Sequence, residues 1–357
     1  MKLQLPSRDY MSDPKTKSMT YAKAGVDIDK ESEIIETLIS EIKTKKKGFG
    51  KPLDLPGHFT GLVDFGEYAL SMCTDGIGSK GMIADAMKKW DTIGIDCIAM
   101  NVNDMICIGA KPIAFVDYLA LEKYDKNMAK EIGKGLAKGA EIADVSIIGG
   151  ETATLPEIVK GFDLGGTCLG YIEKSNIITG KDISLGDIII GLRSSGIHSN
   201  GLTLARKIVK SKKLTFNNSF PGTKMKIGEE LLRPTRIYVK EVLALLEKFP
   251  LKGMAHITGG GLRNLPRLNR KVEFKITSPL KPQEVFTHLQ KLGNVKEKEM
   301  YQTFNMGMGF AIIADPDDAD GILKMLKGKI EAKIVGEIAK GEGASMPRHW
   351  LYFGSEK

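Results

Sequence analysis

The sequence lacks the features that define several protein classes. It has only four cysteines, at positions 73, 97, 107 and 168, and they form neither a paired metal-binding spacing nor a disulfide framework. No apolar run approaches the ~18 residues that a membrane-spanning helix requires. The first residues show no succession of positive, apolar and small residues typical of a signal peptide. These absences predict a cytoplasmic protein with no membrane anchor.

Length and composition indicate a globular protein with two cores. The chain has 357 residues, of which 42% are hydrophobic and 27% charged. Its formal net charge of +8 suits either polyanionic small molecules or nucleic acid. The two lysine-rich runs, around 43–47 and 206–213, have no interleaved aromatic residues, so solvated basic faces are favoured over a nucleic-acid tract.

The hydrophobic patterns predict an α/β (α+β) protein. In the first half they predict helices near 34–42, 92–108 and after Asp125, with strands near 68–73, 113–119, 145–148 and 162–172. Strands and helices alternate again after 187, which predicts a second α/β unit. We therefore divide the chain into a leader (1–19), an N-terminal domain (20–172), a C-terminal domain (173–340) and a tail (341–357).

The segment from Thr74 to Gly81 is the first candidate site. An alternating apolar run leads into a glycine turn that carries Asp75, Gly76, Gly78 and Lys80. An acid and a base at the end of a strand suit a magnesium-bound polyphosphate, because Mg²⁺ prefers hard oxygen ligands and phosphate prefers cationic donors. The glycines also match the dinucleotide fingerprint G-x-G-x-x-G, but the next candidate acid, Asp96, falls inside a predicted helix.

Other acids repeat this pattern along the first half of the chain. Asp104 follows Asn103 on a predicted helix, Asp117 interrupts an apolar strand, and Glu151 lies in a turn after the strand near 145–148. A buried carboxylate needs a cation or hydrogen bonds, so we expect Asp75, Asp104, Asp117 and Glu151 to share one site. Each could instead be a turn or capping residue. The neighbours expected to contact nucleotide are Asn103, Gly149, Gly150 and Thr152.

Two loops in the second half are candidates for substrate binding. The first, between a strand and a helix, contains Ser194, Ser195, His198, Asn200 and Gly201, and the start of the following helix favours an anion. A single loop histidine is more often simply exposed. The second loop, Thr258 to Gly261, includes Gly259 and Gly260 and is rich in backbone amides, which suits a phosphate but also a plain turn.

Taken together, these motifs resemble one enzyme family. YAKAGVDI, TDGIGSK, DTIGIDCIAMNVNDMICIGAKP, IIGGETATLP, SSGIHSNG, RPTRIYVK, HITGGG and EMYQTFNMGMG have the order and spacing of phosphoribosylformylglycinamidine cyclo-ligases, the aminoimidazole ribonucleotide synthetases of purine biosynthesis. The resemblance covers about residues 20 to 340. The shorter motifs alone would also fit relatives such as thiamine-monophosphate kinase and selenophosphate synthetase.

The resemblance implies a fold, a reaction and roles for residues. It implies a homodimer in which the N-terminal mixed sheets of two chains combine into a barrel, flanked by α/β C-terminal domains. The expected reaction converts formylglycinamidine ribonucleotide and ATP into aminoimidazole ribonucleotide, ADP and phosphate. Asp75, Asp104 and Glu151 would hold Mg²⁺, and Lys23 and Asp27 would cover the nucleotide. His198, Lys80 and Asp104 are the expected catalytic residues.

Two other hypotheses remain open from the sequence. One is a sibling kinase-type enzyme that uses ATP on thiamine phosphate or selenide. The other, motivated by the net charge, is a basic nucleotide- or RNA-binding protein on the same scaffold.

Overall fold

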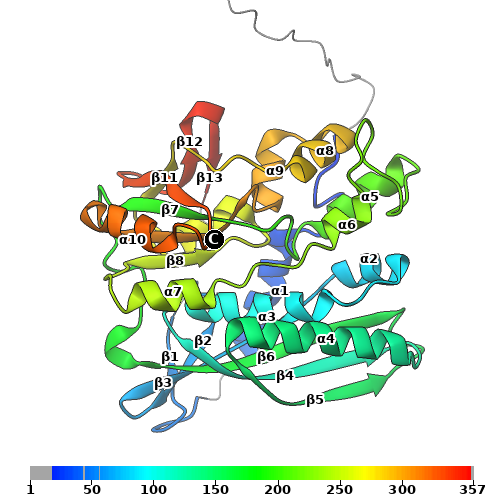
Figure 1. Ribbon diagram of the computed structural model, residues 1–357. Coiled ribbons are helices and arrows are strands. Elements are labelled where there is room, and N and C mark those ends of the chain that lie inside the picture. Colours follow the sequence, from blue (N-terminus) through cyan, green and yellow to red (C-terminus); the bar gives the residue numbers. More distant parts are fainter. Residues whose placement is uncertain (1–17, 43–44, 56, 355–357) are drawn as a thin grey trace, which may run out of the picture.

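A computed structural model describes residues 18–42, 45–55 and 57–354, which form two β-sheets with helices between and around them (Figure 1). The first sheet is mixed and curves like half of a barrel, with strand order β1-β2-β3-β6-β4-β5. Its strands are β1 (Pro52–Leu53), β2 (Gly61–Phe65), β3 (Tyr68–Gly76), β4 (Lys111–Leu121), β5 (Ser146–Thr154) and β6 (Phe162–Glu173).

Three helices accompany this sheet: α2 (Lys80–Met87), α3 (Ile93–Ile106) and α4 (Lys126–Ala143). Helix α3 packs directly on strands β3 and β6 through an almost continuously buried surface. Helices α3 and α4 approach closely because both carry glycine at the crossing, where a Cβ on Gly94 would lie 2.1 Å from the Leu136 nitrogen. Asp125 caps α4 as predicted, accepting from the backbone N–H groups of Asn127 and Met128.

The second sheet has the order β13-β12-β9-β11-β7-β10-β8. Its strands are β7 (Ile188–Arg193), β8 (Gly253–His256), β9 (Glu273–Ile276), β10 (Met308–Ala314), β11 (Ala332–Ala339), β12 (Gly343–Met346) and β13 (Leu351–Phe353). The surrounding α-helices are α5 (Leu202–Ser211), α6 (Ile227–Leu231), α7 (Val239–Leu246), α8 (Glu284–Gly293), α9 (Glu297–Thr303) and α10 (Ala319–Leu326).

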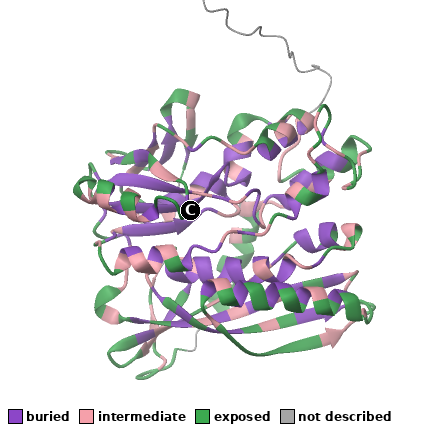
Figure 2. Cartoon of the chain, viewed as in Figure 1, coloured by how far each residue is buried: buried purple, intermediate pink, exposed green. Residues whose placement is uncertain are grey.

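The two halves meet through helices. Helix α7 of the second half contacts α3 and α4 of the first, so helices separate the two sheets (Figure 1). Buried residues are concentrated on the strands and on the helix faces that lie between the sheets (Figure 2). Among the described residues no helix is both long and apolar enough to cross a bilayer.

The structure differs from the predictions in the C-terminal tail and in the burial of the first helix. Residues 1–17 of the predicted leader lie outside the described residues. The predicted tail is wrong for residues 343–353, because β12 pairs with β9 and β13 pairs with β12. Helix α1 (Ile28–Glu41) forms where an amphipathic helix was predicted. Its apolar residues are exposed, however, including Ile34 and Leu38.

The GGET segment was predicted as a turn, and that prediction is wrong. Strand β5 continues through Gly149, Gly150 and Glu151 because the parallel pairing with β4 is maintained as far as Thr154. Glycine is required inside this strand, since a Cβ on Gly150 would lie 2.5 Å from a carboxylate oxygen of Asp117. The turn after β3 also opens directly into α2, a helix that the hydrophobic pattern did not predict.

Candidate active site

Two acids and a histidine converge where the two halves of the molecule meet. Asp75 lies near the end of β3, Asp104 lies on α3, and His256 is the last residue of β8. The His256 Nδ1 atom is 2.8 Å from an Asp104 carboxylate oxygen. If Nδ1–H donates to this carboxylate, Nε2 is left as an acceptor, and it is buried without a hydrogen-bond partner among the described residues. His256 is not among the site residues predicted from the sequence.

The end of strand β3 is fixed by Asn101 on α3. The Asn101 side chain accepts from the Asp75 backbone N–H at 3.0 Å and donates to the Asp75 carbonyl at 3.1 Å. The Asp75 carboxylate in turn accepts from the Gly76 N–H at 2.7 Å. Burial, followed by the nearby Asp104 carboxylate, raises the pKa of Asp75 to about 6.

These acids fit a divalent cation. Two carboxylates supply the hard oxygen ligands that Mg²⁺ prefers, and a cation would offset the cost of keeping Asp75 ionised in a buried place. No group of three His, Cys, Asp or Glu side chains in the described ranges is arranged to hold a metal unaided. Because Mg²⁺ usually keeps several waters and substrate phosphates as ligands, two protein carboxylates suffice for a metal–nucleotide complex.

The sheet register separates Glu151 from the other acids. Asp75 lies opposite Gly166, Gly166 opposite Asp117, and Asp117 opposite Gly150, so these residues form one row across the sheet. Asp75 and Asp117 share the face that α3 covers, and burial raises the pKa of Asp117. Glu151 is one residue beyond this row and therefore points to the opposite face, about three strand spacings, or roughly 14 Å, from β3.

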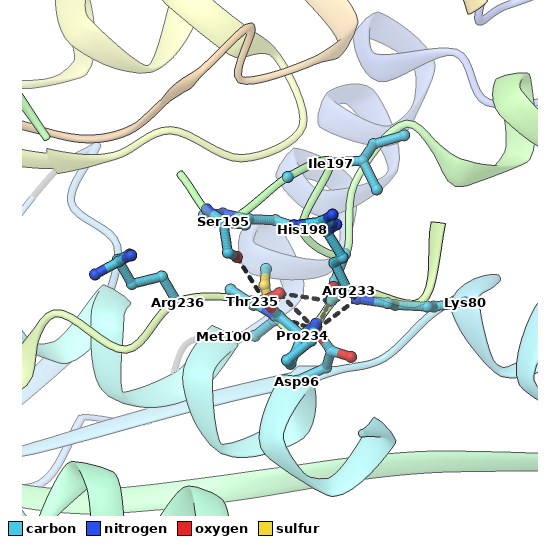
Figure 3. Close-up of polar contacts among 12 residues, drawn as sticks. Lys80, Asp96, Met100, Ser195, Ile197, His198, Arg233, Pro234, Thr235 and Arg236 are labelled. Carbon is cyan, nitrogen blue, oxygen red and sulfur yellow. Dashed lines mark hydrogen bonds and ion pairs between the residues drawn. The ribbon is translucent and has the colours of Figure 1, made fainter. Parts of the chain in front are cut away.

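Lys80 is engaged in a buried polar cluster rather than exposed in the glycine turn. Its ammonium is fully buried, 2.8 Å from an Asp96 carboxylate oxygen, and it donates to the Arg233 carbonyl at 2.6 Å (Figure 3). The same Asp96 oxygen accepts from the Thr235 backbone N–H at 2.7 Å, the Thr235 hydroxyl at 2.6 Å and the Ser199 hydroxyl at 3.1 Å. Asp96 on α3 thus ties the N-terminal half to two loops of the C-terminal half.

Asn103, about two turns further along α3, makes a similar connection. Its side chain donates to the Arg236 carbonyl at 2.8 Å and accepts from the Tyr238 backbone N–H at 3.0 Å. A spacing of seven residues places Asp96 and Asn103 on the same side of the helix. In this arrangement Lys80 and Asn103 position the chain before α7, and their predicted contacts with nucleotide remain predictions.

His198 is buried beneath Gly309, contrary to the usual exposure of a loop histidine. Its backbone adopts the left-handed conformation with φ of 63°, and its Nε2 atom accepts from the Ser195 backbone N–H at 3.2 Å. Burial, with smaller contributions from His256, Lys80 and Arg236, holds the pKa of His198 well below its usual value. The imidazole is therefore neutral at pH 7, and its buried Nδ1 has no partner within the described chain.

The remaining predicted substrate residues line the same junction. Ser195 donates to the Pro234 carbonyl at 2.6 Å, and the Ser194 backbone carbonyl accepts from Gln283 at 2.8 Å. The two predicted loops meet, because a Cβ on Gly259 would lie 3.1 Å from the Asn200 side-chain oxygen. Gly201 and Gly260 both have positive φ, of 74° and 99°.

The N-terminal candidates lie outside this cluster. Asp27 caps α1, accepting from the Lys30 N–H at 3.4 Å, and Lys23 is exposed and donates to the Ser18 carbonyl at 3.0 Å. Their predicted role in covering a nucleotide remains a prediction.

Comparisons with known proteins define the class. Two family models match, the N-terminal domain of AIR synthase related proteins over residues 57–172 and the C-terminal domain over 185–347. The fold also resembles that of AaThiL complexed with AMPPCP and TMP, with a TM-score of 0.62 at 16% identity, covering 90% of this chain and 95% of that one. Thiamine-monophosphate kinase from Stenotrophomonas maltophilia K279a gives a TM-score of 0.60 at 18% identity, covering 89% and 96%. At these identities the likeness concerns the fold alone.

Sequence relatives define the family within this class. The phosphoribosylformylglycinamidine cyclo-ligase of Methanosarcina barkeri is 54% identical over 320 residues, which cover 89% of this chain and 96% of the relative. That of Methanocaldococcus jannaschii is 51% identical over 324 residues, covering 90% and 92%. The chain belongs to the phosphoribosylformylglycinamidine cyclo-ligase family.

Proposed function

We propose that this enzyme converts formylglycinamidine ribonucleotide and ATP into aminoimidazole ribonucleotide, ADP and phosphate in purine biosynthesis. The observation that carries the proposal is identity above 50% over about nine-tenths of the chain to relatives named as cyclo-ligases. The free thiols of Cys73, Cys97, Cys107 and Cys168 are consistent with a reducing cytoplasm.

The proposed reaction must make the formamide oxygen, a poor leaving group, easier to displace. Closing the imidazole ring requires the formamide oxygen to leave, and transfer of the ATP γ-phosphate to this oxygen makes it a phosphate ester. The amidine nitrogen then attacks the activated carbon, and inorganic phosphate departs. Such transfers need positioning and neutralisation of charge more than covalent participation by the protein.

The residues at the junction suit these steps. Asp75 and Asp104 would hold Mg²⁺, which when bound neutralises charge developing on the transferred phosphoryl group. Asp117 lies on the same face of the sheet as Asp75, next to this proposed metal site. Neutral His198 and the Nε2 atom of His256, which has no partner in the described part of the chain, would hold or move a proton during ring closure. Ser194, Ser195 and Asn200 would orient the ribonucleotide.

The decisive experiment supplies the purified chain with ATP and formylglycinamidine ribonucleotide and detects the aminoimidazole product together with ADP. Thiamine monophosphate and selenide serve as competing substrates for the sibling kinase-type activity. Phosphorylation of either one, with no aminoimidazole formed, would replace the cyclo-ligase proposal by the sibling one.

His198→Ala should slow cyclisation by roughly 10²-fold while changing ATP affinity less than about twofold, because the imidazole is expected to act on the ribonucleotide. Steady-state kinetics with separate titration of both substrates would measure this. His198→Asn is the matched control for the backbone, since asparagine tolerates the left-handed conformation better than alanine does. If turnover and ribonucleotide affinity are both normal in the two variants, His198 has no role in the reaction.

The raised pKa of Asp75 predicts a pH dependence. The carboxylate must be ionised to bind a metal–nucleotide complex, so kcat/KM should fall as pH drops below about 6.

For the ligand-free protein, the raised pKa of Asp75 predicts that the free energy of unfolding changes with pH in the opposite direction to the activity. The folded state holds the Asp75 proton more tightly than the unfolded state, so this group lowers stability as pH rises from about 4 to 6. Denaturation of wild type and Asp75→Asn across this range would measure the difference, which should vanish near pH 3.5.

We also propose that the chain forms a homodimer through the open face of the first sheet. This face exposes large apolar side chains from the neighbouring strands β3, β6 and β4, and such a patch is typical of a protein–protein interface. They include Tyr68, Met72, Val116, Tyr118 and Tyr171. Glu151 faces the same side, so in the proposed dimer its carboxylate would lie at or near the interface.

Val116→Lys combined with Tyr118→Lys should convert the dimer into a monomer, because two buried charges would face the second copy. Sedimentation velocity would measure the change. Tyr124→Lys is the matched control, since Tyr124 is 83% exposed on a loop outside the sheet. A wild-type protein that sediments as a monomer at micromolar concentration contradicts the proposal.

A further inference from the structure

A basic cleft of about 850 Å³ lies on the C-terminal half, beside the junction described above. It is formed where β7 ends, where the chain enters α7, and along the segment from α10 into β11. Its charged lining consists of five cations and one acid: Arg193, Arg236, Lys324, Lys327, Lys329 and Glu331. We call this set the basic cleft.

The cleft is connected to the catalytic junction through the chain itself. Arg193 directly precedes Ser194 and Ser195, and Arg236 directly follows Thr235, which binds Asp96. Figure 3 shows Arg236 on the opposite side of Ser195 and Thr235 from Lys80. Through these two arginines the basic cleft borders the loops that carry Ser195 and Thr235.

The two arginines differ in their contacts, and each could bind an anion. Arg193 is held in place by donating to the Lys281 carbonyl, with its Nε atom 3.7 Å from Glu331. The Nε atom of Arg236 is enclosed and has no hydrogen-bond partner among the described residues. A buried donor left unpaired is costly, so turning the half-buried Arg236 side chain to pair this N–H with a phosphate oxygen in the cleft would be favourable.

We propose that the basic cleft binds the 5′-phosphate of the ribonucleotide substrate. This inference rests on the proposed function and assigns the phosphate to these side chains rather than to the amide-rich turn at 258–261. A phosphate monoester carries up to two negative charges and three acceptor oxygens, which suit guanidinium forks supported by lysines. The ATP phosphates are assigned elsewhere, to the acids at the end of β3 and on α3.

The test compares two triple variants that remove the same charge. K324Q/K327Q/K329Q alters exposed lysines of the cleft, and the control K126Q/K130Q/K134Q alters exposed lysines of α4. The cleft variant should raise KM for the ribonucleotide about tenfold, with KM for ATP and kcat changed less than about twofold. The α4 control should change none of them by more than about twofold.

Two further arms separate recognition of the phosphate from recognition of the rest of the substrate. The riboside that lacks the 5′-phosphate should react equally with wild type and the cleft variant. Arg236→Lys, which keeps the charge but loses the guanidinium fork, should also raise KM for the ribonucleotide and leave the riboside unaffected.

Several results would overturn the assignment. An equal rise in KM for ATP would mean that the cleft binds the nucleoside triphosphate. An equal effect of the α4 control would mean that the rise in KM reflects long-range electrostatics and not binding in the cleft. If the cleft variant loses retention on RNA while its KM for the ribonucleotide is unchanged, the cleft is a general polyanion-binding surface. If wild type forms no aminoimidazole, the proposed function fails. Calorimetric binding of ribose 5-phosphate to wild type but not to the cleft variant would then still support the cleft.

Discussion

Asp75→Asn is expected to abolish ATP-dependent turnover while leaving the fold intact. Asparagine keeps the size of the side chain and can still accept from the Gly76 N–H, but it removes the negative charge that would face the proposed metal. We expect a loss of roughly 10³-fold in kcat, which corresponds to about 4 kcal/mol of transition-state stabilisation. Release of phosphate in the presence of both substrates would measure it.

The control for this variant is Asp54→Asn. The Asp54 side chain is 83% exposed, and its one ion pair within the described residues is a 3.7 Å surface contact with Lys45, so its replacement should leave turnover unchanged. Circular dichroism and thermal unfolding would establish that both variants are folded. Turnover at the wild-type level in folded Asp75→Asn would remove this residue from the proposed metal site.

Asp96→Ala is expected to cause the largest loss of stability. It leaves the fully buried Lys80 ammonium without its ion pair and removes the acceptor for Ser199 and for both donors of Thr235. Breaking a buried pair on one side costs about 3–5 kcal/mol, because an uncompensated charge remains. Urea denaturation would measure the change in the free energy of unfolding.

An exposed pair of the same length provides the comparison. Lys138 and Glu141 are also 2.8 Å apart, but both side chains are more than half exposed. Glu141→Ala should therefore cost less than about 1 kcal/mol. Replacing both members of the buried pair, as Lys80→Met with Asp96→Leu, should restore part of the lost stability. Equal effects of Asp96→Ala and Glu141→Ala would mean that burial does not strengthen the Lys80–Asp96 interaction.

The sequence predicted those parts of the site that depend on local patterns. The run from Tyr68 to Gly76 alternates and ends in glycine, and the Asp125 cap is a short-range signal, so both elements were found. His256 could not be found in this way, because its partner Asp104 is 152 residues away and only the packing of β8 on α3 brings them together.

Other differences have the same origin. A lysine in a glycine turn resembles a phosphate ligand, and its buried partner Asp96 was considered only as a misplaced Rossmann acid. The face of the sheet on which Glu151 lies depends on the register between β4 and β5, which the hydrophobic pattern near Gly149 and Gly150 does not specify. Helix α1 shows that a pattern can predict an amphipathic helix without revealing what covers its apolar side.

The cluster around Asp96 has a consequence for how the molecule melts and moves. Rotating the two halves apart would leave the Lys80–Asp96 ion pair intact, but it would break the hydrogen bonds of this buried pair to Arg233, Ser199 and Thr235. We therefore expect one calorimetric transition for both halves, and a junction of fixed width between them. Substrates would then have to enter without any separation of the two halves.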